Sequence, residues 1–210
     1  MLISKKHNFI FIHIYKNAGT SISTALKPFA QSRVFRTANY VLKKVKLPSP
    51  FFDPQPFHGH VTASEIREKL GHELFDSCFS FAFVRNPWDW QVSLYKFMLK
   101  KEEHHQHELI KKLGSFEEYI KWRCDQEALL QKKIIYSDEG EKLVNFVGRF
   151  ETIEADFEKV CLEINVSASL PKLNVSNKNN EPYQSFYTDT TRELVEQAFK
   201  PDIELFGYEF

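Results

Sequence analysis

The sequence has few of the features that mark disulfide-rich, membrane or nucleic-acid-binding proteins. It holds only three cysteines, Cys78, Cys124 and Cys161, without CxxC spacing, so we predict free thiols in a reducing compartment rather than disulfides or zinc. Lys and Arg (28) balance Asp and Glu (28), and zero net charge argues against a protein that coats nucleic acid or an acidic membrane. The apolar run Phe9–Tyr15 is too short to span a membrane, and no small-residue cleavage site follows it. We therefore predict a cytoplasmic protein with neither a signal peptide nor a membrane span.

Glycine is scarce, with 7 residues, whereas phenylalanine is abundant, with 20, and this composition disfavours disorder. A chain of 210 residues buries roughly 70% of its unfolded surface on folding and needs no metal or disulfide to hold it together. We predict a single domain over residues 1–210. The sequence leaves the oligomeric state open.

Two strand–turn–helix units are visible in the pattern of apolar residues. Phe9–Tyr15 is continuous, aromatic and β-branched, as expected for a strand buried on both faces, and the helical spacing after it continues until about Pro28. Cys78–Val84 is a second such strand, and Asn86 is a good N-cap for a helix that runs to about Lys100. Two such units predict an α/β fold with a central, mostly parallel sheet flanked by helices.

Capping signals and apolar spacing predict the remaining elements. The Pro-rich stretch 48–56 and the Asn-rich stretch 174–180 are predicted loops, and the charge run 100–112 is a predicted solvated helix face or loop. A strand is predicted at Leu143–Val147. The predicted helices start at the capping boxes Thr62–Glu65 (ending near Gly71) and Ser115–Glu118, and cover Ile153–Ile164 and Thr191–Lys200.

The turn after the first strand has the composition of an anion-binding loop, in which helix N-terminal N–H groups meet a cation and hydroxyls. The loop residues are Lys16, Asn17, Ala18, Gly19, Thr20 and Ser21. A Walker A loop places its Lys after the second Gly, whereas Lys16 precedes Gly19, so the spacing excludes that ATPase motif. Taken alone, the segment is equally well an ordinary turn with Thr20 as N-cap.

The turn after the second strand adds a guanidinium and a hydroxyl. Arg85 lies at the carboxyl end of its strand, where ligands bind in open parallel sheets, and Ser93 follows eight residues later, about two helical turns on. Together they suit a terminal phosphate monoester. The alternative is a surface Arg paired with Asp89 and an exposed helical Ser.

These motifs resemble those of the sulfotransferases that use 3′-phosphoadenosine 5′-phosphosulfate, most closely the carbohydrate branch that includes heparan sulfate 2-O-sulfotransferase. Lys16–Ser21 is similar to the family's 5′-phosphosulfate loop, and Phe83–Tyr95 to its 3′-phosphate motif, in which an Arg and a Ser eight positions later bind the 3′-phosphate. Val147–Glu151 and Asp202–Tyr208 also resemble family segments, so the resemblance runs nearly end to end. Family members that act on secreted glycans carry a membrane anchor and often disulfides, so this sequence favours a smaller acceptor than a long extracellular polysaccharide.

The resemblance implies a P-loop-like three-layer α/β fold and transfer of a sulfuryl group to a hydroxyl of a carbohydrate or other small metabolite, with no metal. Lys16 would stabilise the departing phosphate oxygen, and His58-Gly-His60 is similar to the segment that supplies the catalytic histidine in the 2-O branch. We predict His60 as the base and His58 as its neighbour or a substrate contact. The alternative functions are a nucleotide-dependent kinase on a related scaffold and a catalytically silent nucleotide-binding module.

Other histidines and the tryptophans have less specific interpretations. His13 is predicted to be a core histidine, and His104, His105 and His107 a solvated surface run rather than metal ligands. A sugar-stacking platform and core packing are both open for the three tryptophans, Trp88, Trp90 and Trp122.

Overall fold

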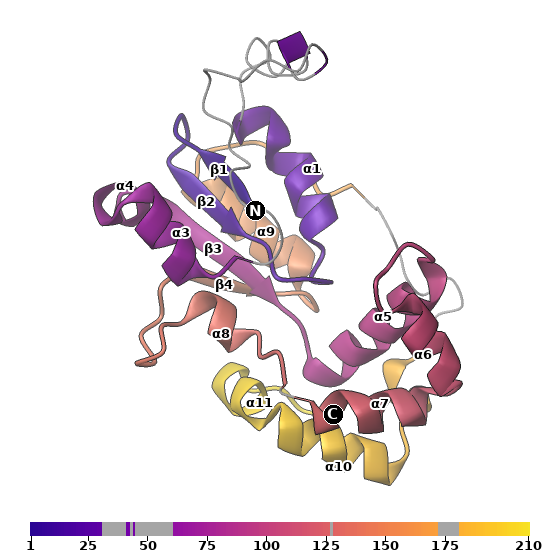
Figure 1. Cartoon of the computed structure of the whole chain (residues 1–210). Helices are drawn as coiled ribbons and strands as arrows, with labels where there is room; N and C mark the ends of the chain where they lie inside the picture. Colours follow the sequence, from indigo (N-terminus) through magenta and orange to yellow (C-terminus); the bar gives the residue numbers. More distant parts are fainter. Residues whose placement is uncertain (31–40, 43, 45–60, 127, 172–180) are drawn as a thin grey trace. The chain divides into compact units, whose positions relative to one another are not determined.

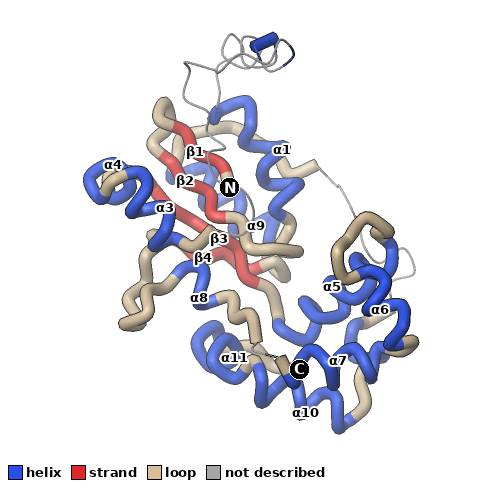
Figure 2. The backbone as a smooth tube through the Cα atoms, in the orientation of Figure 1, coloured by secondary structure: helices blue, strands red, loops and turns tan. Residues whose placement is uncertain are grey.

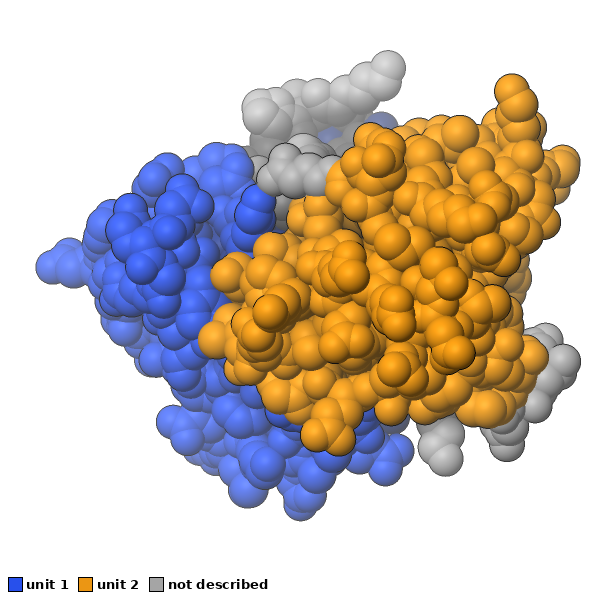
Figure 3. All heavy atoms as spheres, turned by 90° about the horizontal axis from the view of Figure 1, so that it is seen from below, with its two compact units in different colours: residues 1–84, 133–173 blue, residues 85–132, 174–210 orange. Residues whose placement is uncertain are grey.

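The structure, a computed structural model, describes residues 1–30, 41, 42, 44, 61–126, 128–171 and 181–210. The chain divides into two compact units, coloured separately in Figure 3. The first unit comprises Met1–Val84 and Lys133–Leu173, and the second comprises Arg85–Lys132 and Asn174–Phe210. The single domain over residues 1–210 stays a prediction.

A four-stranded sheet forms the centre of the first unit (Figures 1 and 2). Its strands lie side by side in the order of the sequence: β1 (Leu2–Ser4), β2 (Phe9–Ile12), β3 (Phe79–Val84) and β4 (Phe146–Arg149). The pairs β2–β3 and β3–β4 are parallel, whereas β1 runs antiparallel to β2. The prediction of an α/β fold with a mostly parallel sheet flanked by helices is confirmed.

The two central strands are the ones that the apolar runs predicted. Every residue of β2 is buried, as are all of β3 except the half-buried Phe79, because parallel strands are covered on both faces. The sequence did not predict β1, a short strand joined to β2 by a tight turn in which Asn8 has a φ of 46°. The last strand, β4, begins three residues later than the predicted Leu143–Val147.

Helices α1 (Gly19–Ala30) and α9 (Ile153–Glu163) share one apolar core with the sheet. Side chains alternate along a strand, so Phe9, Phe11, Phe81 and Phe83 all point to this core. The helix residues that complete it are Ile22, Leu26, Phe157, Val160, Cys161 and Ile164.

Helix α1 continues to Ala30, two residues beyond Pro28, around which the sequence predicted its end. Proline removes one backbone donor from the last turn. That turn is tied down from outside the helix, since Ser4 Oγ donates a hydrogen bond of 2.8 Å to Phe29 O. Burial of Leu26 against the sheet also holds the helix in place.

Close packing of the strands requires glycine at one position of β4. A Cβ at position 148 would lie 2.5 Å from Cε1 of Phe83 on the neighbouring strand. Gly148 therefore lets the aromatic ring of Phe83 lie flat over β4 beside the end of β3.

Shorter helices complete the first unit. Helix α3 (Ala63–Leu70) starts at the predicted capping box, in which Thr62 Oγ1 accepts from the Glu65 N–H and Glu65 accepts from the Thr62 N–H. The predicted stop is confirmed by Gly71, but a further short helix, α4 (His72–Asp76), follows directly and was not predicted. A single turn, α8 (Lys132–Ile135), begins at the boundary between the units.

The described part of the second unit is helical. Asn86 caps α5 and Ser115 caps α7 as predicted. The predicted helix at Thr191–Lys200 corresponds to the helix Asp189–Ala198 to within two residues at each end, whereas a further helix over Lys200–Phe206 was not predicted. The elements are α5 (Pro87–Lys100), α6 (His107–Leu113), α7 (Phe116–Asp125), the 3₁₀ turn η1 (Tyr183–Phe186), α10 (Asp189–Ala198) and α11 (Lys200–Phe206).

Candidate functional site

The turn between β2 and α1 has an unusual backbone. Lys16 and Ala18 have φ values of 64° and 57°, in the left-handed region that residues other than glycine seldom adopt. Such conformations persist only where the surroundings impose them, and they are frequent at ligand-binding sites. The Asn17 side chain supplies one such constraint, because its Nδ2 donates a 2.8 Å hydrogen bond to Phe83 O, near the end of β3. This bond fixes the loop beside the carboxyl end of the next strand.

Helix α1 begins in contact with His13. A Cβ at position 19 would overlap the His13 ring, so Gly19 is the residue that lets the first turn approach this close. His13 is half-buried and its ring lies 6.1 Å from that of Phe11, which agrees with a packed rather than a solvated histidine. In the first turn of α1, Ser21 is buried and Thr20 is exposed, and no acidic residue is present to repel an anion.

Arg85 begins the second unit and is buried, with 7% of its surface exposed. Its Nε donates a 2.7 Å hydrogen bond to Asp89 Oδ2 one helical turn later. The pairing with Asp89 is the one that the alternative interpretation expected, but the arginine is not on the surface. Burial of a guanidinium is costly in free energy unless its donors are hydrogen-bonded, so the chain holds Arg85 at this position through specific contacts.

Ser93 lies in the interior of α5 with only 3% of its surface exposed. Its Oγ has no hydrogen-bond partner among the residues that the structure describes. The expectation of an exposed helical serine is therefore wrong. A buried hydroxyl without a protein partner indicates a bond to water or to a ligand.

The Asn86 side chain caps α5 and also holds the C-terminal segment. Its Oδ1 accepts from the Trp88 N–H, and its Nδ2 donates to the carbonyl of Glu209 at 2.7 Å. Tyr183 Oη lies 3.3 Å from the same nitrogen. The Arg85–Asn86 turn is thus fixed by the Glu209 carbonyl and the Tyr183 hydroxyl, which come from distant parts of the second unit.

Sequence reasoning missed Gln131, a fully buried residue of the second unit. Its Oε1 accepts from the Arg85 N–H at 2.9 Å, and its Nε2 donates to Arg85 O at 2.8 Å. No local pattern signals this contact, since 46 residues separate the partners.

His60, the predicted base, and His58, its predicted neighbour, lie outside the described residues. The predicted loops 48–56 and 174–180 lie outside them as well. In the charge run, His105 is exposed and His104 half-buried, and their rings stack at 4.5 Å. The prediction of a solvated residue is wrong for His107, which is buried with its Nδ1 2.9 Å from Met98 O. Across the described ranges, no three His, Cys, Asp or Glu side chains are grouped as a metal site would need.

Two of the three tryptophans belong to the core of the second unit. Trp90 packs edge-on against Phe199, and Trp88 packs against Phe210 while its Nε1 donates to Arg192 O. Both are buried, so core packing, not sugar stacking, accounts for them. Trp122 is half-buried beside Tyr119.

The three cysteines are free, and burial raises the pKa of each thiol, that of Cys124 to about 11. All three are therefore protonated at neutral pH, and none is a reactive thiolate. Among the helices that the structure describes, none has the length and apolar character needed to cross a bilayer.

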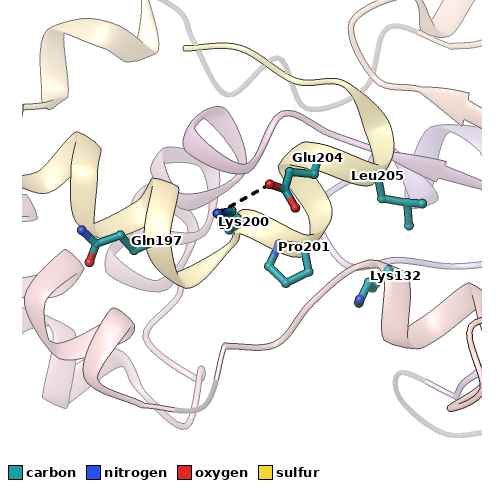
Figure 4. A pocket seen from close by; sticks show the side chains of 6 residues that line it. All are labelled: Lys132, Gln197, Lys200, Pro201, Glu204 and Leu205. Atoms are coloured by element: carbon teal, nitrogen blue, oxygen red, sulfur yellow. Dashed lines mark ion pairs between the residues drawn. The ribbon is translucent and has the colours of Figure 1, made fainter.

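A hollow of about 610 Å³ lies in the second unit, and Figure 4 shows the side chains that line it. None of the predicted site residues lines it, and the charged side chains Lys200 and Glu204 in it pair with each other at 3.6 Å. Its lining residues are Lys132, Gln197, Lys200, Pro201, Glu204 and Leu205. The hollow is a surface feature distinct from the two turns described above.

Comparison with known proteins gives the two turns a context. An uncharacterized protein of Archaeoglobus fulgidus is 29% identical over 119 residues, which cover 55% of this chain and 92% of that protein. The family model described as "Sulfotransferase family" matches residues 1–209, almost the whole chain. This match supports sulfotransfer as the activity, and the chain belongs to the sulfotransferase family.

Proposed function

We propose that the protein transfers a sulfuryl group from 3′-phosphoadenosine 5′-phosphosulfate to a hydroxyl of a carbohydrate or another small metabolite. One observation carries this proposal: Arg85 and Ser93, in the turn after β3 and the helix that follows it, are both buried, and Ser93 Oγ has no partner among the described residues. The family membership of the chain supports the reaction type.

The 3′-phosphate of the donor is assigned to Arg85 and Ser93. The guanidinium of Arg85, held at Nε by Asp89, is a planar array of N–H donors whose geometry suits a bidentate pair with phosphate oxygens. A hydroxyl such as Ser93 Oγ is a donor to such an oxygen, and the dianion would satisfy an atom that the described protein leaves without a bond. The residues of this turn therefore fit a phosphate monoester.

The 5′-phosphosulfate is assigned to the loop Lys16–Ser21. Backbone N–H groups of Asn17 to Ser21 would hold the 5′-phosphate at the N-terminus of α1, where the helix dipole favours negative charge. Lys16 would donate to the bridging oxygen between sulfur and phosphorus as negative charge develops on it. The donor supplies the activated sulfuryl group, and no metal is needed in this scheme because Lys, Arg and amides meet its charges.

The acceptor hydroxyl must lose a proton as its oxygen bonds to sulfur and the bond from sulfur to the bridging oxygen breaks. We assign that proton to His60 as the base, with His58 as its neighbour or as a contact of the acceptor. The products are the sulfated acceptor and adenosine 3′,5′-bisphosphate. An imidazole that must be neutral to act makes activity rise with pH through its pKa, which is nominally about 6.5.

Mass spectrometry of small hydroxyl acceptors incubated with the protein and the donor tests the proposal. We expect a sulfated product that needs neither magnesium nor ATP. Product formation only with magnesium and ATP would indicate phosphoryl transfer instead, and binding of the donor without any product would indicate a silent nucleotide-binding module.

His60→Ala separates chemistry from binding within the same assay. We expect it to lower kcat roughly 10²- to 10⁴-fold while donor affinity stays near wild type, because a base contacts the acceptor rather than the nucleotide. His58→Ala is the matched variant, with a milder loss that falls partly on the acceptor KM. A near-normal kcat in His60→Ala would move the base to another residue.

A further inference from the structure

Gln131 binds the main chain of Arg85 as a neighbouring strand would. In an antiparallel ladder, a residue gives its N–H to one partner and its C=O to the same partner. The Gln131 side chain makes both of these bonds to Arg85, at 2.9 and 2.8 Å, directly after the last residue of β3. Both residues are buried, since Gln131 is fully buried and only 7% of the surface of Arg85 is exposed.

Gln131 is in turn held by Asp202, in the first turn of α11. One carboxylate oxygen, Oδ2, accepts from the Gln131 N–H at 2.7 Å, and the other, Oδ1, accepts from the Lys132 N–H at 3.0 Å. Asp202 has no exposed surface. The carboxylate thus fixes the backbone from which the Gln131 side chain extends, and all of these residues belong to the second unit.

We propose that Gln131 is a positioning residue for recognition of the donor's 3′-phosphate, and that Asp202 supports this role by holding the Gln131 backbone. Gln131 contacts the Arg85 main chain and not the guanidinium, so it acts through Arg85. This inference rests on the proposed function, which assigns the 3′-phosphate to Arg85 and Ser93.

The reason lies in the length of the arginine side chain. A guanidinium at the end of four rotatable bonds binds both oxygens of a phosphate only if its Cα and its stem are held in one orientation. Asp89 fixes the stem through Nε, and Gln131 fixes the main chain through two bonds. Ser93 needs no such device, because it lies in the interior of α5, whose backbone is already fixed.

The test uses calorimetry on the full chain with two probes, adenosine 3′,5′-bisphosphate and adenosine 5′-monophosphate. Gln131→Met keeps the size of the side chain and removes both bonds. We expect about a tenfold loss of bisphosphate affinity, equivalent to about 1.4 kcal/mol, and a change of less than about twofold for the monophosphate. In the Arg85→Ala background, Gln131→Met should cause no further loss, because residues that act through one another are not additive.

Gln91→Met is the matched control. Gln91 is also fully buried in the second unit and loses a hydrogen bond on substitution, since its Oε1 accepts from Tyr119 Oη at 2.8 Å, but no described contact joins it to Arg85. We expect it to lower thermal stability and to leave the ratio of the two affinities unchanged. Gln131→Asn, which retains an amide too short to reach both Arg85 atoms, replaces Gln131→Met if that variant does not fold, and the same criteria apply to it.

The outcomes separate this inference from the proposed function. A wild-type chain that binds both nucleotides equally contradicts the proposed function before any variant is made. A wild-type preference for the bisphosphate that survives in Gln131→Met, or equal losses for both nucleotides, overturns the positioning role alone. An additive loss in the double variant also overturns it, because Gln131 would then act independently of Arg85.

Discussion

The two turns assigned to the donor are built in opposite ways. The turn after β2 relies on its own backbone: Lys16 and Ala18 lie in the left-handed region, and the Asn17 side chain bonds this turn to Phe83 O in β3. The turn after β3 has an ordinary helix cap, and its position depends on groups far away in the sequence, namely the Gln131 side chain and the Glu209 carbonyl that accepts from Asn86. The first presents main-chain N–H groups and the second presents a side-chain cation.

This difference has a physical reason in what each turn is proposed to bind. Main-chain N–H groups are oriented by φ and ψ, so a loop that binds through them needs a defined and locally strained backbone. A guanidinium carries its own planar array of donors, and what it needs instead is a main chain held in one orientation. Changes in the first turn should therefore act on the chemistry, and changes in the second turn on affinity.

The largest effect is expected for Arg85→Ala in the second turn. Removing a charged partner from a buried phosphate costs about 2–5 kcal/mol. Calorimetry should show that loss for adenosine 3′,5′-bisphosphate and little change for the 5′-monophosphate. Arg67→Ala is the control, since Arg67 pairs with Asp76 at the surface of the first unit. Equal losses for both nucleotides would contradict the assignment of the 3′-phosphate.

Lys16→Ala tests the first turn and should have the opposite kinetic signature. If Lys16 stabilises the leaving oxygen, kcat falls on the order of 10²-fold or more, while donor affinity changes less. Steady-state kinetics with varied donor concentration measures both quantities. An unchanged kcat with a raised donor KM would show that Lys16 only holds the ground state, and the contrast between the turns would then disappear.

Asp202, which holds Gln131 and through it the second turn, predicts a pH dependence of stability. Burial raises the pKa of Asp202 from 3.8 to about 6, against the opposing effect of its bonds to the Lys132 and Gln131 N–H groups. The folded state thus holds this proton more tightly than the unfolded state does, so the contribution is present below about pH 4 and is lost as pH rises through about 6. The expected loss is on the order of 3 kcal/mol.

Denaturant unfolding of the wild type and of Asp202→Asn between pH 4 and 7 measures this contribution. The difference between the two curves isolates Asp202 from carboxylates whose pKa is lowered, such as Asp76 and Asp156, which contribute in the opposite direction. A pH-independent difference would show that Asp202 is ionised in both states over this range.

The comparison of the two turns also explains which parts of the molecule the sequence predicted. Strands β2 and β3 and helix α5 were predictable because burial on both faces and a local cap leave a continuous signal in neighbouring residues. Lys16 and Arg85 were found because their motifs lie within one turn. The contacts of Gln131 were not predictable, because its partners Arg85 and Asp202 are 46 and 71 residues away in the sequence.

Errors at element ends have the same origin. The sequence predicted an end of α1 around Pro28, but the helix continues two residues further, where the bond from Ser4 to Phe29 O and the burial of Leu26, both tertiary, hold its last turn. The sequence predicted a last helix over Thr191–Lys200, but α10 ends at Ala198, and after a break at Phe199 the unpredicted helix α11 begins. That break places Asp202 in the first turn of a new helix, where a carboxylate is favoured.

The smallest effect is expected for Asn17→Ala, which removes the side-chain hydrogen bond from the first turn to Phe83 O. Loss of a buried hydrogen bond to the Phe83 carbonyl costs about 1–3 kcal/mol in stability, because that carbonyl loses its bond to Asn17. Because the same bond helps to impose the left-handed conformations beside it, kcat should also fall, by about tenfold, with Lys16 still present. Thermal unfolding and steady-state kinetics on one preparation measure both.

Asn86→Ala is the matched variant in the second turn, where the lost cap should lower stability and bisphosphate affinity but leave kcat at saturating donor close to wild type. If Asn17→Ala lowers only stability, the loop geometry does not depend on this bond and the strain at Lys16 is imposed by other contacts.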